Sequence, residues 1–268
     1  MKQYEVYKNS GIEWLEQIPE HWDLIRLKDL GLLQNGISKS KEYFGKGFPF
    51  LGYGNIYNDR IELKHIKNLA NSTTEDQRNY SVLGGDVFFT RTSETIDEIG
   101  IASTCINTVE KATFSGFAIR LRPNKNKINK YFSRFYFRAN INRVFLSSKM
   151  NSVTRASLSQ NVLNNLPTIL PPIKEQKAIA NYLETKTTGI DEKRSLLTQK
   201  IEHYKELRKS IINQAVTKGL DKNIELKDSG INWIGQIPEH WELVRIKDIF
   251  SISRGRVIGK TELKDKGL

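Results

Sequence analysis

The sequence predicts an α+β protein in which a strand-rich α/β domain is followed by one long helix of the coiled-coil-forming kind. Three observations lead to this fold class. Short β-branched and aromatic segments, interrupted by Gly and Asn, occupy residues 24–122. A proline-free amphipathic stretch of more than forty residues follows a Pro-Pro pair at 171–172. A segment near the start of the chain is repeated near its end. A chain of 268 residues is long enough for one large hydrophobic core or two small ones.

The first domain is expected to contain a mostly antiparallel sheet. Gly-containing turns such as LGGD and SGF separate its strands, and so many Gly interruptions disfavour helices. The expected strands lie in FPFLGYGNI, LGGDVFFTR, IGIASTCI and FSGFAIRLRP. The segment from Asn129 to about Phe145 is then predicted to be one helix, with Asn129 as its N-cap.

The long helix begins after Pro171–Pro172, because paired prolines suit a first helical turn and cannot continue an earlier helix. Gly189 marks a bend point, and Gly219 is the expected C-terminal cap. Apolar residues recur along it at spacings of three and four, with Arg194 and Arg208 as polar members of the same stripe. These apolar residues are Ile190, Leu197, Ile201, Tyr204, Ile211 and Ala215. We expect this stripe to contact a second helix, although its first half could pack on its own domain.

The pentapeptide IPEHW occurs at residues 18–22 and again at 237–241. Aligning residues 9–30 with 228–249 gives 14 identities in 22 positions, so the chain contains an internal repeat with a period of 219 residues. Such a period indicates duplication of a whole domain plus connector rather than a solenoid. The expected organisation is a first domain at 1–170, a helical region at 171–220 and the start of a second repeat at 221–268.

The net charge of +12 is concentrated in one part of the chain. From Lys111 through Lys174 there is no acidic residue, and this stretch holds 12 of the 42 basic residues. The remaining 30 basic residues balance the 30 acidic ones. Segregated positive charge suits a polyanion, since Lys and Arg that neutralise phosphates release counterions. A solvated basic face without a ligand is the alternative.

Three loops place Lys or Arg beside hydroxyl and amide side chains: ISKSKEYFGKG, TRTSET and SSKMNSVTR. Such loops can hold phosphates and contact base edges. The expected DNA-binding residues of these loops are Lys39, Lys41, Arg91, Ser93, Lys149, Asn151 and Arg155. Lys130, Arg134 and Arg138 recur every four residues and are expected to form a phosphate-facing stripe on the predicted helix.

Catalytic chemistry is not indicated. The single Cys105 lies in a strand-like segment and is expected to be a buried, inert thiol. No nucleophile, metal cluster or cofactor loop was found, so an enzyme is the least favoured class. No apolar run approaches the ~18 residues of a membrane span, and the N-terminal residues do not form a secretory signal, so a cytoplasmic protein is expected.

The chain resembles the specificity (S, HsdS) subunits of type I restriction-modification systems. The resemblance rests on GIEWLEQIPEHWDLIRLKDL, FPFLGYGNI, LGGDVFFTR and above all LPTILPPIKEQKAIANYLETKTTGIDEKRSLLTQKIEHYKELRKSIINQAVTKGL. It covers essentially the whole chain. It implies a non-catalytic protein whose first domain is a target-recognition domain for double-stranded DNA. It also implies a helical spacer and two bound methyltransferase (M) subunits that carry S-adenosylmethionine, with the restriction (R) subunit attached through them.

The family pattern has two recognition domains and two helical regions, whereas this sequence carries one of each plus the start of another repeat. We therefore expect two chains to associate through antiparallel helices and to recognise a gapped inverted repeat. One of the two repeated segments is then expected to be surplus or exchanged with the partner. The alternative is a truncated, regulatory or inactive S subunit that binds M subunits without site-specific DNA recognition.

Overall fold

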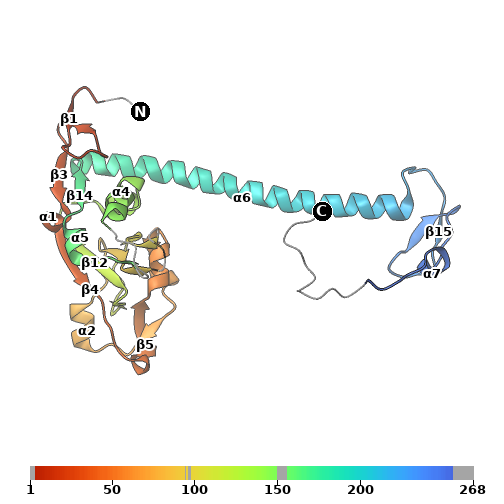
Figure 1. Ribbon diagram of the computed structural model, residues 1–268, viewed down its shortest axis with the longest axis horizontal. Helices are drawn as coiled ribbons and strands as arrows, with labels where there is room; N and C mark the ends of the chain where they lie inside the picture. Colours follow the sequence, from red (N-terminus) through yellow and green to blue (C-terminus); the bar gives the residue numbers. More distant parts are fainter. Residues whose placement is uncertain (1–3, 94, 96–97, 150–155, 256–268) are drawn as a thin grey trace. The chain divides into compact units, whose positions relative to one another are not determined.

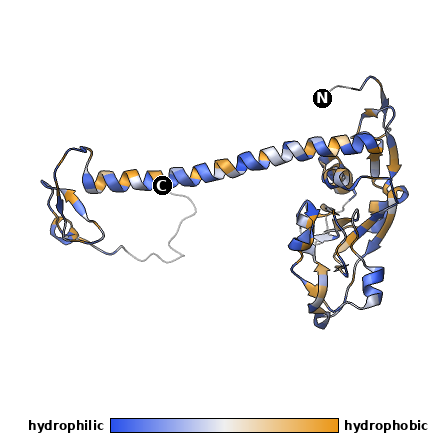
Figure 2. Cartoon of the chain, turned by 180° about the vertical axis from the view of Figure 1, so that it is seen from behind, coloured by the Kyte–Doolittle hydropathy of each residue, from blue (hydrophilic) through white to orange (hydrophobic). Residues whose placement is uncertain are grey.

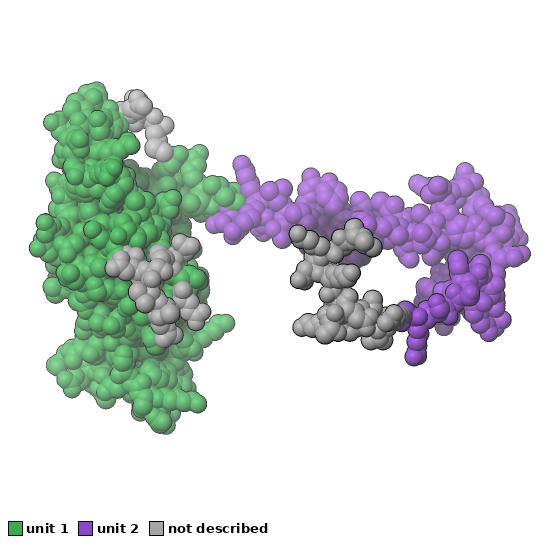
Figure 3. Space-filling model, viewed as in Figure 1, with its two compact units in different colours: residues 1–190 green, residues 191–268 purple. Residues whose placement is uncertain are grey.

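The computed structural model describes residues 4–93, 95, 98–149 and 156–255. The chain divides into two compact units, residues 1–190 and 191–268 (Figure 3). The first unit therefore contains the strand-rich domain together with the beginning of the long helix α6 (Ile173–Lys218).

The main sheet of the first unit has five strands in the order β4-β12-β8-β10-β6. Its strands β4 and β12 are labelled in Figure 1. Every neighbouring pair is antiparallel except β10 and β6, which are parallel. The strands are β4 (Gly31–Asn35), β6 (Arg60–Ile61), β8 (Val87–Thr90), β10 (Ala102–Cys105) and β12 (Ala118–Pro123). The predicted mostly antiparallel sheet is confirmed, and three of the four expected segments supply its strands.

The fourth expected segment belongs to a second sheet, in which β5 (Phe44–Leu51) pairs in parallel with β11 (Thr113–Phe114) and antiparallel with β7 (Leu69–Ala70). Two further short pairs join β3 (Asp23–Arg26) to β14 (Pro167–Leu170) and β9 (Thr92–Ser93) to β13 (Ala156–Ser157).

Both faces of the main sheet are covered. Successive side chains of β8 point to opposite faces, so Val87 and Phe89 join one apolar cluster while Phe88 joins the other. The first cluster is closed by helices, and Leu146 and Leu163 pack there. The second is closed by the β5 region, with Phe88 edge-on to Phe114 at a ring-centroid distance of 5.1 Å. A strand buried on both faces explains the unbroken apolar run VFF.

The shorter helical elements connect these strands. They are α1 (Leu27–Leu30), α2 (Thr74–Asn79), α3 (Lys130–Tyr136), α4 (Asn140–Ser148), α5 (Gln160–Asn164) and the 3₁₀ turns at Lys41–Tyr43, Tyr53–Tyr57 and Leu63–His65.

The prediction of one helix from Asn129 to about Phe145 is wrong. Asn129 does cap a helix, since its Oδ1 accepts from the backbone amides of Tyr131 and Phe132. That helix, α3, ends at Tyr136, and α4 begins at Asn140. The chain turns between them because Phe137 enters the core beside Phe89, at a ring-centroid distance of 5.5 Å.

Helix α6 is continuous from Ile173 to Lys218, so its start after Pro171–Pro172 is confirmed and Gly189 does not interrupt it. Gly219 ends it as predicted, with a φ of 74° that favours glycine and an amide that donates to the Ala215 carbonyl. Among the described residues, no helix is both long and apolar enough to cross a bilayer.

The two copies of the repeat form the same hairpin in the same register. In the first unit β1 (Tyr7–Asn9) pairs with β2 (Gln17–Pro19), and in the second β15 (Leu226–Asp228) pairs with β16 (Gln236–Pro238). A short helix follows in each, α1 in the first and α7 (Ile246–Ile249) in the second. The repeat therefore encodes one small structural module twice.

The residue after each short helix distinguishes the copies. Gly31 lies so close to β12 that an added Cβ would come within 2.2 Å of the Arg122 carbonyl oxygen. The equivalent residue in the second copy is Phe250, which is 65% exposed. A side chain of that size cannot occupy the place of Gly31 unless the backbone of the neighbouring strand moves.

Candidate nucleic-acid interface

The loop between β4 and β5 presents two exposed ammonium groups, those of Lys39 and Lys41. Two backbone hydrogen bonds anchor the base of this loop. The Ile37 amide donates to the Phe114 carbonyl at 2.8 Å, and the Gly116 amide donates to the Ile37 carbonyl at 2.7 Å. The Lys39 ammonium lies 6.0 Å from the centroid of the Tyr43 ring. The two lysines are therefore available to solvent on a loop fixed to the core at its base.

Arg91 is attached to the same turn. Its backbone amide donates to the Phe117 carbonyl at 2.9 Å, and its Nη1 donates to the Gly116 carbonyl at 3.2 Å. The turn at 115–117 thus brings the loop of Lys39 and Lys41 together with Arg91. Phe117 itself is 60% exposed in this turn, and the sequence reasoning passed over it. Its position directly after Ser115-Gly116 in a predicted turn could have indicated that this aromatic side chain is exposed.

Ser93 lies in β9 and is buried. Its hydroxyl donates to Glu98 Oε2 at 2.7 Å and accepts from the Thr95 amide at 3.3 Å. In the described structure this hydroxyl shapes its own loop and is turned away from solvent.

The expected stripe of Lys130, Arg134 and Arg138 is not formed, because the chain turns after α3. Arg134 is buried, and its guanidinium contacts both Asp59 and Glu184, with Nε at 2.7 Å from Asp59 Oδ2. Lys130 Nζ donates to the Ile106 carbonyl at 2.8 Å. Arg138 Nη1 donates to the carbonyls of Ala102 and Asn58. Lys130 and Arg134 thus connect α3 to neighbouring elements, whereas Arg138 lies beyond the end of α3 and remains exposed while it donates to backbone carbonyls.

Lys149, the C-cap of α4, is exposed. Asn151 and Arg155, the other residues expected in this loop, lie outside the described residues.

Other basic residues of the acid-free segment also turn inward. The Arg122 guanidinium donates two hydrogen bonds, of 2.8 and 2.6 Å, to the buried carboxylate of Asp86. Arg120 is buried, and desolvation, with the nearby charge of Arg122, lowers its pKa to about 10. Arg143 donates to the Ile99 carbonyl. Much of the positive charge that the sequence concentrates here therefore pairs with acceptors from other parts of the domain.

The apolar stripe of α6 is exposed from Ile190 to Ile211, and Ala215 at its end is half-buried. Ile190 is 64% exposed, Ile201 54% and Tyr204 55%, values far above those of core residues. Figure 2 shows hydrophobic residues recurring along this helix. Apolar residues spaced at three and four and left in water are typical of a surface for another helix.

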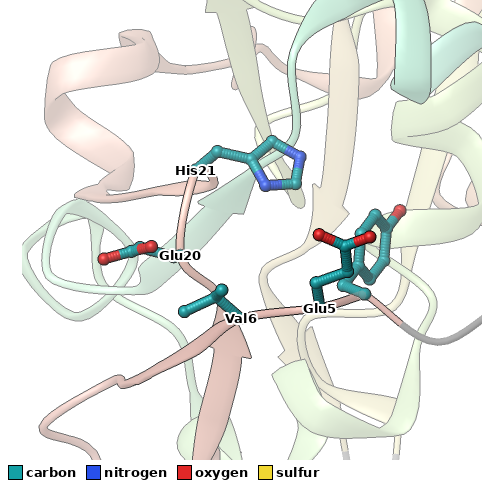
Figure 4. A pocket seen from close by; sticks show the side chains of 5 residues that line it. Glu5, Val6, Glu20 and His21 are labelled. Atoms are coloured by element: carbon teal, nitrogen blue, oxygen red, sulfur yellow. The ribbon is translucent and has the colours of Figure 1, made fainter.

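A cluster around Glu175, which the sequence reasoning missed, fastens the first repeat to α6. The Glu175 carboxylate accepts from Tyr4 Oη at 2.9 Å and from Trp22 Nε1 at 3.0 Å, and it lies 2.7 Å from His21 Nε2. His21 also lines a hollow with Tyr4, Glu5, Val6 and Glu20 (Figure 4). The sequence feature that could have indicated this contact is the presence of hydrogen-bond donors, His21 and Trp22, in IPEHW and of an acceptor, Glu175, in PPIKEQ.

We expect the Glu175 cluster to make stability depend on pH. Burial opposes ionisation, but hydrogen bonds from Trp22, His21 and Tyr4 outweigh it and hold the pKa of Glu175 below its ordinary value. The stabilisation is therefore present above pH ~4.5 and lost as the pH falls through the folded-state pKa. Thermal unfolding should show Glu175→Gln less stable than the parent at pH 7, with the difference shrinking towards pH 3. Glu192→Gln, on an exposed part of α6, is the control, and an equal difference at both pH values would contradict the expectation.

Cys105 is fully buried, and burial, with the nearby Asp86 carboxylate, raises the pKa of its thiol to about 12. The predicted burial of this thiol is confirmed, and a raised pKa disfavours the reactive thiolate. No group of three His, Cys, Asp or Glu side chains that could hold a metal ion occurs in the described part of the chain.

The fold matches solved structures of one class. The HsdS subunit from Thermoanaerobacter tengcongensis superposes with a TM-score of 0.54 at 17% identity, covering 81% of this chain and 49% of that one. A structure described as the basis of complex assembly and conformational transition of the type I R-M system gives a TM-score of 0.61 at 18% identity, covering 81% of this chain and 50% of that chain. The architecture is therefore that of HsdS subunits.

Residues 19–203 match the family model described as the type I restriction modification DNA specificity domain. The chain belongs to this family. A putative type I restriction enzyme MjaX specificity subunit from Methanocaldococcus jannaschii is 28% identical over 246 residues, which is 90% of this chain and 56% of that protein. The chain thus spans about half the length of the curated relatives it matches.

Proposed function

We propose that this chain is a non-catalytic, sequence-specific DNA-binding subunit of a type I restriction-modification complex. The strand-rich domain recognises one half of a bipartite site in double-stranded DNA. Two chains associate through antiparallel α6 helices, so that the dimer recognises a gapped inverted repeat. The dimer also scaffolds methyltransferase subunits, which carry S-adenosylmethionine, and binds the restriction subunit through them.

The observation that carries the proposal is the exposed apolar stripe on α6 in a member of the specificity family. Exposing apolar surface to water costs free energy, at about 25 cal/mol per Å². A second helix packed against the stripe would bury this surface and so stabilise the pair. Lys39 and Lys41 supply exposed positive charge for DNA contacts, and Phe117 in the neighbouring turn supplies an exposed aromatic side chain.

Mapping methylated adenines in cells that express this chain with its M subunit tests the proposal. The expected result is one motif made of two identical half-sites in opposite orientation, separated by a gap of fixed length. An asymmetric motif would contradict the homodimer. Co-purification of M without any site-specific methylation would instead support a truncated, inactive S subunit.

The DNA contacts make a separate prediction. If Lys41 contacts a phosphate, Lys41→Ala should weaken binding to all sequences alike and lower the salt dependence, d log K/d log[salt], by about one unit. Lys8→Ala, at an exposed position of β1, is the matched control and should leave the slope unchanged. Fluorescence anisotropy on specific and unrelated duplexes over a salt series would measure both. A change confined to one sequence would assign Lys41 to base recognition instead.

A further inference from the structure

The face of α6 that carries the apolar stripe changes its surroundings at one point. Upstream, Gln176 and Ala180 on this face are buried, and Leu183 and Thr187 are half-buried, in the first unit. The next position of the stripe, Ile190, is exposed. The stripe is therefore exposed from Ile190 to Ile211, and its last residue, Ala215, is half-buried shortly before the C-cap at Gly219.

The stripe from Ile190 to Ala215 is symmetric about its own centre. Its eight positions, the six apolar residues together with Arg194 and Arg208, are placed as mirror images about the midpoint between Glu202 and His203. In an antiparallel pair with a two-fold axis at that midpoint, each residue faces the residue of the second copy that lies equally far from the midpoint on its other side. The facing pairs are Ile201 with Tyr204, Leu197 with Arg208, Arg194 with Ile211, and Ile190 with Ala215.

We infer that a second copy of this chain binds the stripe in this one register, with the two-fold axis passing between Glu202 and His203. The inference rests on the proposed homodimer and specifies its contacts. Each arginine then faces an aliphatic side chain, so its methylene stem can pack while the guanidinium reaches solvent. No two arginines face each other, and the first exposed position is matched to the last position of the stripe.

Neighbouring registers are worse for reasons visible in the structure. A slip of one heptad in one direction sets Ile211 of the second copy against Thr187 and its Ala215 against Leu183, where the chain's own domain already packs. A slip in the other direction sets Arg194 against Lys218 of the second copy, a contact between like charges. That slip also leaves Ile190 beyond the end of the partner's helix.

Disulfide trapping in the full chain tests the register, because Cys105 is buried and leaves the surface free of thiols among the described residues. The variant Leu197→Cys/Arg208→Cys places two cysteines opposite each other in the inferred register. Ile190→Cys/Arg208→Cys and Leu197→Cys/Ala215→Cys are matched to the two slipped registers, and each shares one position with the first variant. None of these pairs can close within one helix, since the two sites are at least ~16 Å apart along it.

We expect the first variant to form a covalent dimer at least about tenfold faster than the other two, because a one-heptad slip moves facing sites ~10 Å apart, beyond disulfide reach. Non-reducing electrophoresis and mass spectrometry would identify the bonded cysteines. Faster trapping of either slipped variant would overturn the register while leaving the dimer intact. Light scattering on the parent chain separates the two ideas, since a monomer at micromolar concentration would overturn the homodimer itself.

Discussion

Replacing Ile201 by Asp is expected to abolish self-association of this protein at micromolar concentration. Ile201 lies at the centre of the stripe and would face Tyr204 of the second copy in the proposed homodimer, so each dimer of the variant would bury two carboxylates without partners. Burying an unpaired charge costs several kcal/mol, and dimerisation should weaken by at least about 100-fold. Analytical ultracentrifugation would measure the loss, and binding to an inverted-repeat duplex should fall with it.

Leu196→Asp is the matched control for this substitution. Leu196 is 64% exposed on the same stretch of α6, but it lies outside the stripe. It should dimerise like the parent. Equal disruption by both substitutions would indicate that a different face of α6 carries the contact.

Replacing Arg134 by Ala should destabilise the first unit. The side chain is 9% exposed and joins α3 to Asp59 and to Glu184 of α6. Its loss removes charge-assisted hydrogen bonds and leaves a void, for a cost of at least about 2 kcal/mol. The cost stays below that of a fully buried ion pair because both carboxylates remain partly solvated.

Urea unfolding of the full chain would measure this change as a lower midpoint. Lys149→Ala removes an exposed positive charge from the end of α4 and should leave the free energy of unfolding within about 0.5 kcal/mol of the parent's. If Arg134→Ala unfolded at the parent's midpoint but bound DNA more weakly, the side chain would act on DNA rather than on the fold.

Local patterns were sufficient for much of the architecture. The apolar run at Val87–Thr90, the Asn129 cap, the prolines before Ile173 and the glycine after Lys218 each determine an element through neighbouring residues alone. The repeat likewise predicted a shared module, and both copies form the same hairpin.

Contacts between distant residues explain what sequence reasoning missed. Arg134 appeared to belong to a surface stripe, but Asp59 lies 75 residues before it and Glu184 50 residues after it. Nothing in the helical spacing of α3 reveals those partners. The chain reverses after Tyr136 because Phe137 fits the core, and periodicity cannot show that preference. The Glu175 cluster was missed for the same reason, since Trp22 lies 153 residues before Glu175 in the sequence.

The contrast between Gly31 and Phe250 has a consequence for protein engineering. The hairpin and the short helix that ends at Leu30 or Ile249 occur in both copies, whereas Gly31 fits the particular strand beside it. A foreign recognition domain grafted onto this scaffold should therefore be joined directly after residue 30 and should bring its own residue at 31. A junction placed one residue later would keep Gly31, which fits the edge of β12, beside a strand from a different domain.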